Sequence, residues 1–214
     1  WSSILEIENV GMLNEIIYTG KVGELIRIAE GLHEKKIANI ADMIAYSSQK
    51  KNLVLISGPS SSGKTTFAHR LFIQLRVNGL KPITISTDDY FVDRDRTPID
   101  ENGQPDFEAL EAVDVELFNK HLEALFEGME IECPIYDFKS GMRNKTCRRL
   151  KINEDNVIIV EGIHALNERL TFIVPSERKF KIYVSALTSL NIDDHNRIPT
   201  TDTRLIRRIV TDNK

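Results

Sequence analysis

The sequence predicts an α/β fold, a doubly wound parallel sheet with flanking helices, and three observations support this prediction. Residues 53–57 are a short apolar run with the β-branched content of a buried parallel strand, and residues 82–86 follow as a second strand. A third strand is expected from residue 156, with a continuous apolar run at residues 157–160. The first two strands and the helix between them form a βαβ unit, in which two parallel strands are joined by a right-handed crossover. The helix between the first two runs is indicated by apolar residues at helical spacing: Phe67, Leu71 and Leu75.

The N-terminal part of the chain is predicted to be a helical segment of its own. Apolar residues recur at helical spacing through residues 10–45, and Gly20 and Gly23 are expected to separate a short helix from a long one. A polar stretch then breaks the pattern before the first strand. We therefore expect a helical segment at residues 1–50 and a second domain at residues 51–214.

The remaining elements follow in order along the chain. The helix after Gly63 is expected to end at Gly79. Beyond it, the pattern predicts a loop at residues 93–104, a helix at residues 110–125, a strand pair at residues 131–135 and 147–152 around a polar connection, a strand at residues 181–185, and the start of a helix at residues 204–210.

The composition is that of an ordinary globular protein. The 214 residues are 41% hydrophobic and 28% charged, which suffices for a full core. The net charge of -4 argues against a dominant contact with nucleic acid or an anionic membrane, since both usually recruit a basic surface. No run of about 18 apolar residues predicts a transmembrane helix. Cys133 and Cys147 are expected to be reduced thiols, and a cytoplasmic location is expected.

Residues 58–65, Gly-Pro-Ser-Ser-Ser-Gly-Lys-Thr, match the pattern G-x-x-x-x-G-K-[ST] between a predicted strand and a predicted helix. The glycines let backbone N–H groups face phosphates, and the helix N-terminus adds the positive end of its dipole. Lys64 would reach the β- and γ-phosphates, and Thr65 would offer its hydroxyl to Mg²⁺. The motif predicts a P-loop NTPase fold with ATP and Mg²⁺ as cofactors. Nucleotide contacts are expected from Gly58, Pro59, Ser60, Ser61, Ser62, Gly63, Lys64, Thr65 and Thr66.

Carboxylates follow two of the predicted strands, at the sheet edge where ligands of such folds bind. Glu161 closes the third strand and is expected, with Thr65, to support Mg²⁺. Asp88 and Asp89 follow the second strand, where a carboxylate could accept the proton of an attacking hydroxyl. Spacing alone leaves the choice between them open. A base at this position favours a kinase over an enzyme that activates only water.

With these residues in view, the chain resembles the uridine kinase and phosphoribulokinase family from about Asn52 onward. The similarity is carried by five motifs in the family's order, at residues 58–66, 86–91, 134–138, 161–163 and 202–208. The resemblance implies that Asp88 is the general base and that Arg204 and Arg207 clamp the transferred phosphate. These arginines are three apart and share one helix face. It also implies an acceptor site that includes Asp89, Glu108, Tyr136 and Arg143, with Tyr136 as a wall of a nucleoside pocket.

The chain departs from the family at three positions that bear on the acceptor. Gly141 stands where uridine–cytidine kinases place a base-recognising histidine, Glu108 replaces a ribose-binding aspartate, and Phe91 replaces a tyrosine. Residues 10–45 resemble the helical stretch before the kinase domain of longer bacterial proteins, which also carry a region similar to the N-terminal part of threonyl-tRNA synthetase. Trp1 and Lys214 are accordingly expected to be cuts within a longer chain, the second where the lid of the family begins.

The sequence favours ATP-dependent phosphoryl transfer to a hydroxyl of a small acceptor, with a nucleoside as the first candidate. One alternative is a nucleotide-dependent switch or RNA-associated regulatory module, suggested by the N-terminal segment and the altered acceptor residues. Another is a kinase that acts on a sugar phosphate or a different small alcohol. We expect a small-molecule partner and no membrane or nucleic acid, and a homo-oligomer would fit by analogy with related folds.

Overall fold

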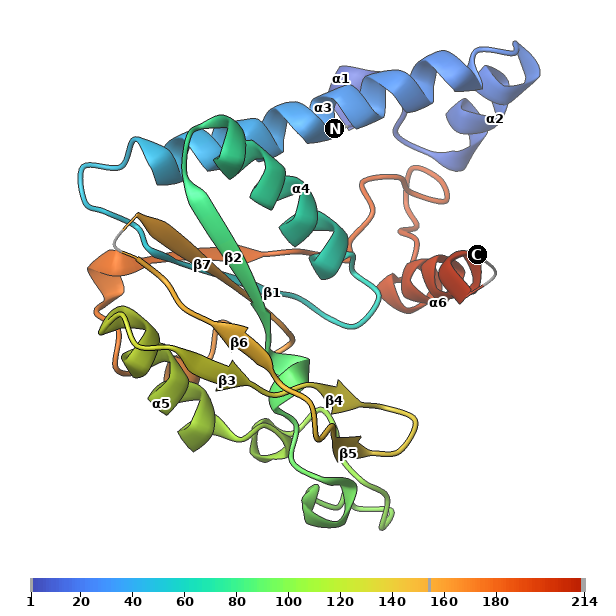
Figure 1. Cartoon of the computed structure of the whole chain (residues 1–214). Helices are drawn as coiled ribbons and strands as arrows, with labels where there is room; N and C mark the ends of the chain where they lie inside the picture. Colours follow the sequence, from blue (N-terminus) through green and yellow to red (C-terminus); the bar gives the residue numbers. More distant parts are fainter. Residues whose placement is uncertain (1, 154, 213–214) are drawn as a thin grey trace.

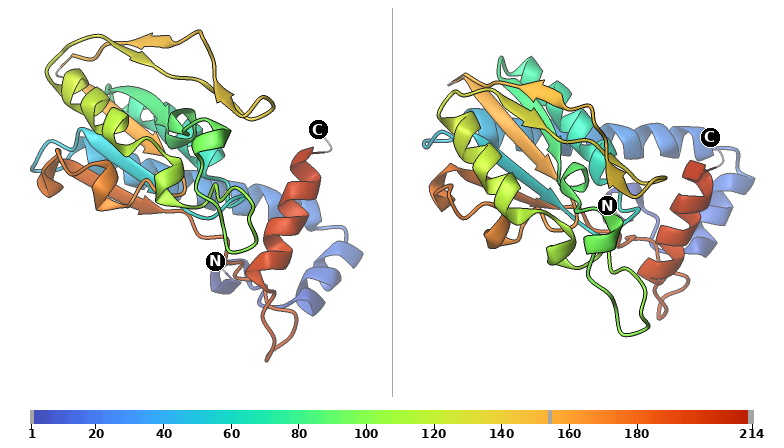
Figure 2. Two further views of the ribbon diagram at one scale, coloured as in Figure 1. Left: turned by 90° about the horizontal axis from the view of Figure 1, so that it is seen from below. Right: turned by 60° about the horizontal axis from the view of Figure 1, so that its bottom comes forward.

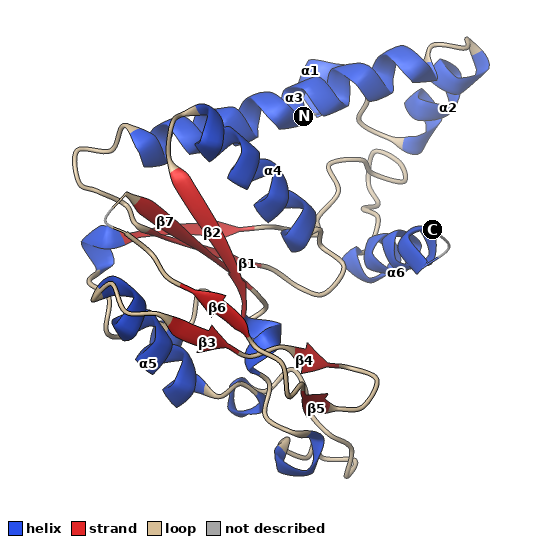
Figure 3. Ribbon diagram, in the orientation of Figure 1, coloured by secondary structure: helices blue, strands red, loops and turns tan. Residues whose placement is uncertain are grey.

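The structure is a computed structural model that describes residues 2–153 and 155–212. Its centre is a four-stranded parallel sheet (Figures 1 and 3). The strands lie in the order β2-β7-β1-β8. The register places Ile56 and Ser86 on either side of Glu161, so the carboxyl ends of three strands meet. This confirms the predicted α/β fold. The strands are β1 (Leu53–Ser57), β2 (Lys81–Ser86), β7 (Asn156–Glu161) and β8 (Lys179–Tyr183).

Two helices, α3 (Val22–Ala45) and α4 (Lys64–Val77), cover one face of the sheet (Figure 1). An ion pair between Arg70 and Glu30, at 2.6 Å, joins the helices at their exposed side. The core of this face comprises Ile37, Ala41 and Ile44 of α3, Ala68, Leu71 and Leu75 of α4, and Val54, Ile56, Val157 and Ile159 of the strands. The N-terminal segment therefore shares a hydrophobic core with the sheet.

The opposite face is covered by α5 (Val115–Phe126) and by an antiparallel pair, β3 (Ile131–Cys133) and β6 (Arg148–Leu150), as Figure 2 shows. Successive residues of β1 and β7 point to opposite faces, which explains why both strands are apolar throughout. The core of this face includes Leu53, Leu55, Ile158 and Val160 of the strands and Phe118, Leu122 and Leu125 of α5.

The chain begins with two short helices, α1 (Ser2–Leu5) and α2 (Val10–Tyr18), which precede α3. Gly20, at φ 75°, makes the turn between α2 and α3, as predicted, whereas Gly23 lies inside α3. Three hydrogen bonds tie this region to the segment after β8. Val10 N donates to Asn191 O at 3.0 Å, and Asn191 N donates to Glu8 O at 2.9 Å. Asn9 Nδ2 donates to Asp194 Oδ1 at 3.0 Å.

The last helix, α6 (Thr200–Asp212), starts earlier than the predicted residue 204. Its first turn forms on Pro199, whose carbonyl accepts the N–H of Thr203 at 3.2 Å. Both views in Figure 2 place α6 at the same end of the molecule as α2.

Three other predictions of local structure were inexact. The predicted polar connection contains a small hairpin, β4 (Tyr136–Asp137) and β5 (Met142–Arg143). The helix expected from residue 110 begins at Val115, after a 3-10 turn at Leu110–Ala112. Strand β8 begins at Lys179, which pairs with Leu53 of β1, rather than at residue 181, and it ends at Tyr183 rather than residue 185. The side chain of Lys179 is buried and donates to Glu168 at 2.7 Å.

No helix within the described residues is long and apolar enough to cross a membrane. Cys133, which is buried, and Cys147, which is exposed, are both free thiols.

Candidate active site

The loop between β1 and α4 has a backbone that only particular residues allow. An ideal Cβ on Gly58 would lie 2.2 Å from the carbonyl oxygen of Val184. Gly63 has φ 95° and directly precedes α4, and Ser61, at φ 60°, is also in the left-handed region. Such a conformation costs a non-glycine residue free energy and is common at ligand sites. The loop thus curls against β8 and leads into a helix N-terminus, which favours anions.

Lys64, the first residue of α4, lies at the centre of the site. Its Nζ donates to the carbonyl oxygen of Pro59 at 3.1 Å. Burial lowers the pKa of Lys64, and the carboxylates of Glu161 and Asp88 oppose this effect. The ammonium is therefore close enough to both acids to interact with them, although they follow different strands.

The two predicted metal-binding residues come together. Thr65 Oγ1 lies 3.3 Å from each carboxylate oxygen of Glu161, and Ser86 Oγ lies 3.2 Å from Glu161 Oε1. Burial raises the pKa of Glu161, and the nearby Asp88 raises it further. Within the described ranges, no group of three or more His, Cys, Asp or Glu side chains could hold a metal by itself. The hydroxyl and carboxylate oxygens fit Mg²⁺, which usually retains water and takes oxygen ligands from phosphates.

Asp88 and Asp89 belong to one 3-10 turn, Thr87–Tyr90, yet they face different surroundings. Burial raises the pKa of Asp88, and the ammonium of Lys64 is the main group that opposes it. Burial also raises the pKa of Asp89, but there a hydrogen bond from the backbone N–H of Tyr136 opposes it. Asp88 is thus directed toward the phosphate loop, whereas Asp89 is held against strand β4.

An aromatic cluster begins at Phe91, directly after this turn. The ring centroids of Phe91 and Tyr136 are 5.5 Å apart and those of Tyr136 and Phe138 are 5.1 Å apart, both edge to face. Phe107 packs on Phe91 at 5.9 Å. Tyr136 is buried, and its hydroxyl has no hydrogen-bond partner among the described residues. The cluster offers apolar surface with one unused hydroxyl.

Arg143 and Glu108, two predicted acceptor contacts, are placed differently. The guanidinium of Arg143 donates to the carbonyl oxygens of Phe91, at 2.9 Å, and Tyr90, at 3.0 Å. It also pairs with Asp114 at 3.1 Å. Arg143 therefore holds the backbone that carries Phe91. The side chain of Glu108 is exposed, and its carbonyl oxygen bonds His164 Nε2 at 2.8 Å.

Gly141 lies beneath the guanidinium of Arg94. An ideal Cβ on Gly141, which has φ 71°, would lie 2.6 Å from Arg94 Nε. Arg94 N donates to Gly141 O at 2.9 Å, and Arg94 Nη2 donates to Phe138 O at 3.1 Å. A side chain at position 141 would require Arg94 to move, so Arg94 takes up the space that a larger residue would need.

The arginines of α6 contact the phosphate loop directly. Arg204 Nε donates to Ser60 O at 2.9 Å, and Arg207 Nε donates to Ser61 O at 3.0 Å. A cavity of about 260 Å³ lies between the loop and the helix. The described residues that line it are Ser61, Gly63, Lys64, Thr65, Thr66, Arg207, Arg208 and Thr211.

Two residues of this region went unrecognised in the sequence. Ser86 is the last residue of β2, and its position at a strand end beside two aspartates was a signal that could have been used. Its Oγ also accepts the N–H of Asp88 at 3.3 Å and so helps to shape the turn. Arg94 had no such signal, because only the fold of a long loop brings it to Gly141.

Comparisons with known proteins agree with this geometry. The model of the Phosphoribulokinase / Uridine kinase family matches residues 53–212. The uridine kinase of Ligilactobacillus salivarius is 32% identical over 172 residues, which are 79% of this chain and 70% of that protein. Inorganic pyrophosphatase TTM2 of Arabidopsis thaliana is 34% identical over 151 residues, which are 69% of this chain. The chain spans only 21% of the length of TTM2 and 66% of that of the uridine kinase of Halalkalibacterium halodurans.

A solved structure is similar in fold. The structure of a possible uridine kinase from Bacillus stearothermophilus superposes with a TM-score of 0.52 at 23% identity, over 84% of this chain and 89% of that one. The family match covers the sheet, the phosphate loop, both strand-end acids and the arginine helix. The chain therefore belongs to the phosphoribulokinase and uridine kinase family of P-loop kinases.

Proposed function

We propose that this chain transfers the γ-phosphoryl group of ATP to a hydroxyl group of a small, nucleoside-like acceptor. The observation that supports this most strongly is the position of Asp88. Its carboxylate is partly buried and interacts with Lys64 beside the phosphate loop, and the turn that carries it leads directly into Phe91 of the aromatic cluster. A base beside a nucleotide site, followed in the chain by an aromatic cluster, suits transfer to an alcohol.

Asp88 is the general base of the proposed reaction. As the acceptor oxygen forms its bond to the γ-phosphorus, the carboxylate takes up the hydroxyl proton and the bond from that phosphorus to the β–γ bridging oxygen breaks, which releases ADP. The raised pKa of Asp88 makes it a stronger base than an exposed aspartate. Asp89 is held by the Tyr136 backbone and is the weaker candidate for this role.

The remaining charged groups would act on the phosphates. Loop N–H groups and Lys64 would hold the β- and γ-phosphates, while Arg204 and Arg207 would approach from α6. Thr65 and Glu161 would hold Mg²⁺, which neutralises charge that develops on the phosphate oxygens. The hydroxyl of Ser62, buried and unpaired among the described residues, offers one more donor in the loop.

The aromatic cluster and Arg94 together form the proposed acceptor pocket, which suits a compound with a flat ring. The rings of Phe91, Tyr136 and Phe138 would pack against it, and the free hydroxyl of Tyr136 would hydrogen-bond it. Arg94 over Gly141 brings a cation with several donors to the pocket. A ring or substituent rich in acceptor atoms therefore suits the pocket better than an apolar one.

The test measures ADP release with Mg·ATP and a panel of uridine, cytidine, purine nucleosides and sugar phosphates. Asp88→Asn is the variant and Asp95→Asn, an exposed residue of the same connection, is the matched control. We expect one acceptor to accelerate ADP release, and Asp88→Asn to lower that rate by ~10²-fold or more. ATP affinity should be retained in both variants.

The panel also separates the competing functions. Acceleration by a sugar phosphate alone would keep the kinase mechanism and replace the nucleoside. Slow ATP hydrolysis that is indifferent to every acceptor and to Asp88→Asn would refute phosphoryl transfer to an alcohol, and a nucleotide-dependent switch would become the better account.

A further inference from the structure

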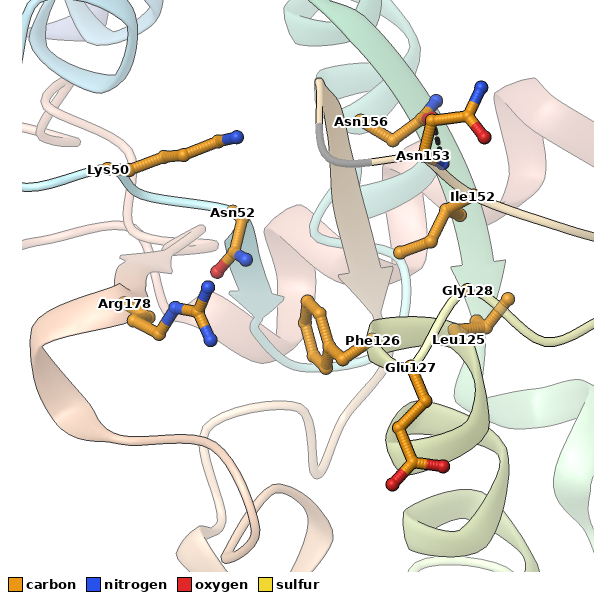
Figure 4. Close-up of a pocket in the computed structure, with 10 residues that line it drawn as sticks. All are labelled: Lys50, Asn52, Leu125, Phe126, Glu127, Gly128, Ile152, Asn153, Asn156 and Arg178. Carbon is orange, nitrogen blue, oxygen red and sulfur yellow. Dashed lines mark hydrogen bonds between the residues drawn. The ribbon is translucent and has the colours of Figure 1, made fainter.

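A second cavity lies at the opposite end of the sheet from the phosphate loop. It has a volume of about 660 Å³, within the range of small-molecule sites. Asn52 precedes β1 and Asn156 opens β7, so this cavity is at the amino ends of the strands whose carboxyl ends carry Gly58 and Glu161. Its lining residues are Lys50, Asn52, Leu125, Phe126, Glu127, Gly128, Ile152, Asn153, Asn156 and Arg178 (Figure 4).

The charge of the lining favours an anion. Arg178 lies over the ring of Phe126, 5.8 Å from its centroid, and Lys50 adds a second cation. The acidic lining residue is Glu127, and Figure 4 shows its carboxylate pointing away from Arg178 and Asn52. An anionic group would therefore meet guanidinium and ammonium donors beside an aromatic ring.

Asn52 supplies unused hydrogen-bonding capacity at the same place. Its side chain is directed toward Arg178 and Phe126 in Figure 4. The residue is only 6% exposed, and its Oδ1 has no partner among the described residues. Because a buried polar atom without a partner is costly, the amide is an independent sign that a polar ligand belongs here.

The walls of the cavity are held in place by hydrogen bonds. Lys51 Nζ donates to the carbonyl oxygen of Glu177, which joins the segment of Asn52 to the turn that carries Arg178. Across the cavity, Asn153 N donates to Asn156 Oδ1 at 2.7 Å. A preformed site loses less conformational entropy when it binds a ligand.

We propose that this cavity is a second ligand site, for a nucleoside monophosphate. Its phosphate would bind Arg178 and Lys50, and its base would lie against Phe126 with a ring N–H toward the amide of Asn52. A phosphorylated ring compound fills the volume better than a free phosphate or an amino acid. The binding chemistry of the cavity is independent of the kinase reaction, but its use as a product sensor rests on the proposed function. The site would let the protein sense the class of compound that a nucleoside kinase releases.

The test uses uridine 5′-monophosphate, uridine and inorganic phosphate as probes on the full chain. Titration calorimetry measures affinity, and hydrogen exchange shows where each probe binds. We expect the monophosphate to bind more tightly than either fragment and to protect residues 125–128 and 176–178. Arg178→Ala should weaken it by roughly tenfold or more, because a charge-assisted contact is lost. Arg149→Ala, an exposed arginine paired with Glu132, should not.

Phe126→Leu provides a second variant that keeps an apolar side chain of similar size and should weaken the monophosphate more than inorganic phosphate. The proposal is overturned if no probe binds at millimolar concentration, or if protection appears only at residues 58–66 and 136–143, which is the active site. If no acceptor accelerates ADP release, the proposed function fails. Protection of residues 125–128 by the monophosphate would still show that the second ligand site exists.

Discussion

Gly58→Ala tests whether the phosphate loop is built against β8 as the structure shows. The new methyl group would lie 2.2 Å from the carbonyl oxygen of Val184, about 1.2 Å inside an ordinary contact. That oxygen belongs to the backbone, and the same residue donates its N–H to Ser57 O at 2.7 Å. The methyl group can be accommodated only if the loop or the end of β8 moves.

The cost can be estimated from these contacts. Overpacking of this kind costs ~1–3 kcal/mol. At ~2–4 °C per kcal/mol for a chain of this size, the melting temperature should fall by about 2–12 °C. ATP affinity should fall by roughly tenfold or more, because displaced loop N–H groups no longer point together at the phosphates.

The assay combines thermal unfolding with ATP titration. Gly31→Ala is the matched control, because nothing lies within 4 Å of its ideal Cβ and it is in the interior of α3, where alanine is favoured over glycine by ~1 kcal/mol. The control should melt slightly higher and bind ATP unchanged. If Gly58→Ala keeps both the melting temperature and the affinity for ATP, the close approach of loop and strand is wrong.

Three further predictions concern other parts of the molecule. Ile37→Ala should lower the free energy of unfolding by ~2–5 kcal/mol, because Ile37 of α3 is fully buried in the core against the sheet. Ile26→Ala, on the exposed side of α3, should change it by less than ~0.5 kcal/mol, and thermal unfolding measures both. Lys179 and Lys181 lower the pKa of Glu168 from 4.5 to about 2, so this pairing stabilises the fold above pH 4.5 and is lost as pH falls toward 2. Glu168→Gln should flatten that part of a melting curve measured against pH, and an unchanged profile would exclude the pairing. Arg207→Ala should lower kcat by roughly tenfold or more with little change in melting temperature. A clear fall in melting temperature together with the fall in kcat would instead indicate that Arg207 has a structural role.

The sheet and its phosphate loop were predictable because their signals are local. Strands β1 and β7 contain continuous apolar runs, and the loop motif lies between a strand and a helix whose patterns are clear. Strand β8 was placed two residues late, because a buried lysine at its start depends on Glu168, a partner that spacing does not reveal. The hairpin of β4 and β5 was missed because its strands have two residues each, which is too short for an alternating pattern to be recognised.

In the candidate site, too, some residues were predictable from local sequence patterns and others were not. Thr65 and Glu161 could be paired from sequence, because the carboxyl ends of parallel strands share one edge of the sheet. The different surroundings of Asp88 and Asp89 depend on a single 3-10 turn and on a backbone N–H from Tyr136. The contact of Arg204 with Ser60 joins residues 144 positions apart, and no local pattern indicates it.

The hydrogen bonds of residues 8–10 give the N-terminal segment a mechanical role. Its long helix packs on α4, which starts at Lys64, while its beginning is fastened to Asn191 and Asp194, which lead into α6. One segment thus braces two elements that approach the phosphates from different sides, although it supplies no reacting group. Because the same segment contacts both, a tilt of α3 relative to the sheet would move Arg204 and Arg207 relative to the phosphate loop.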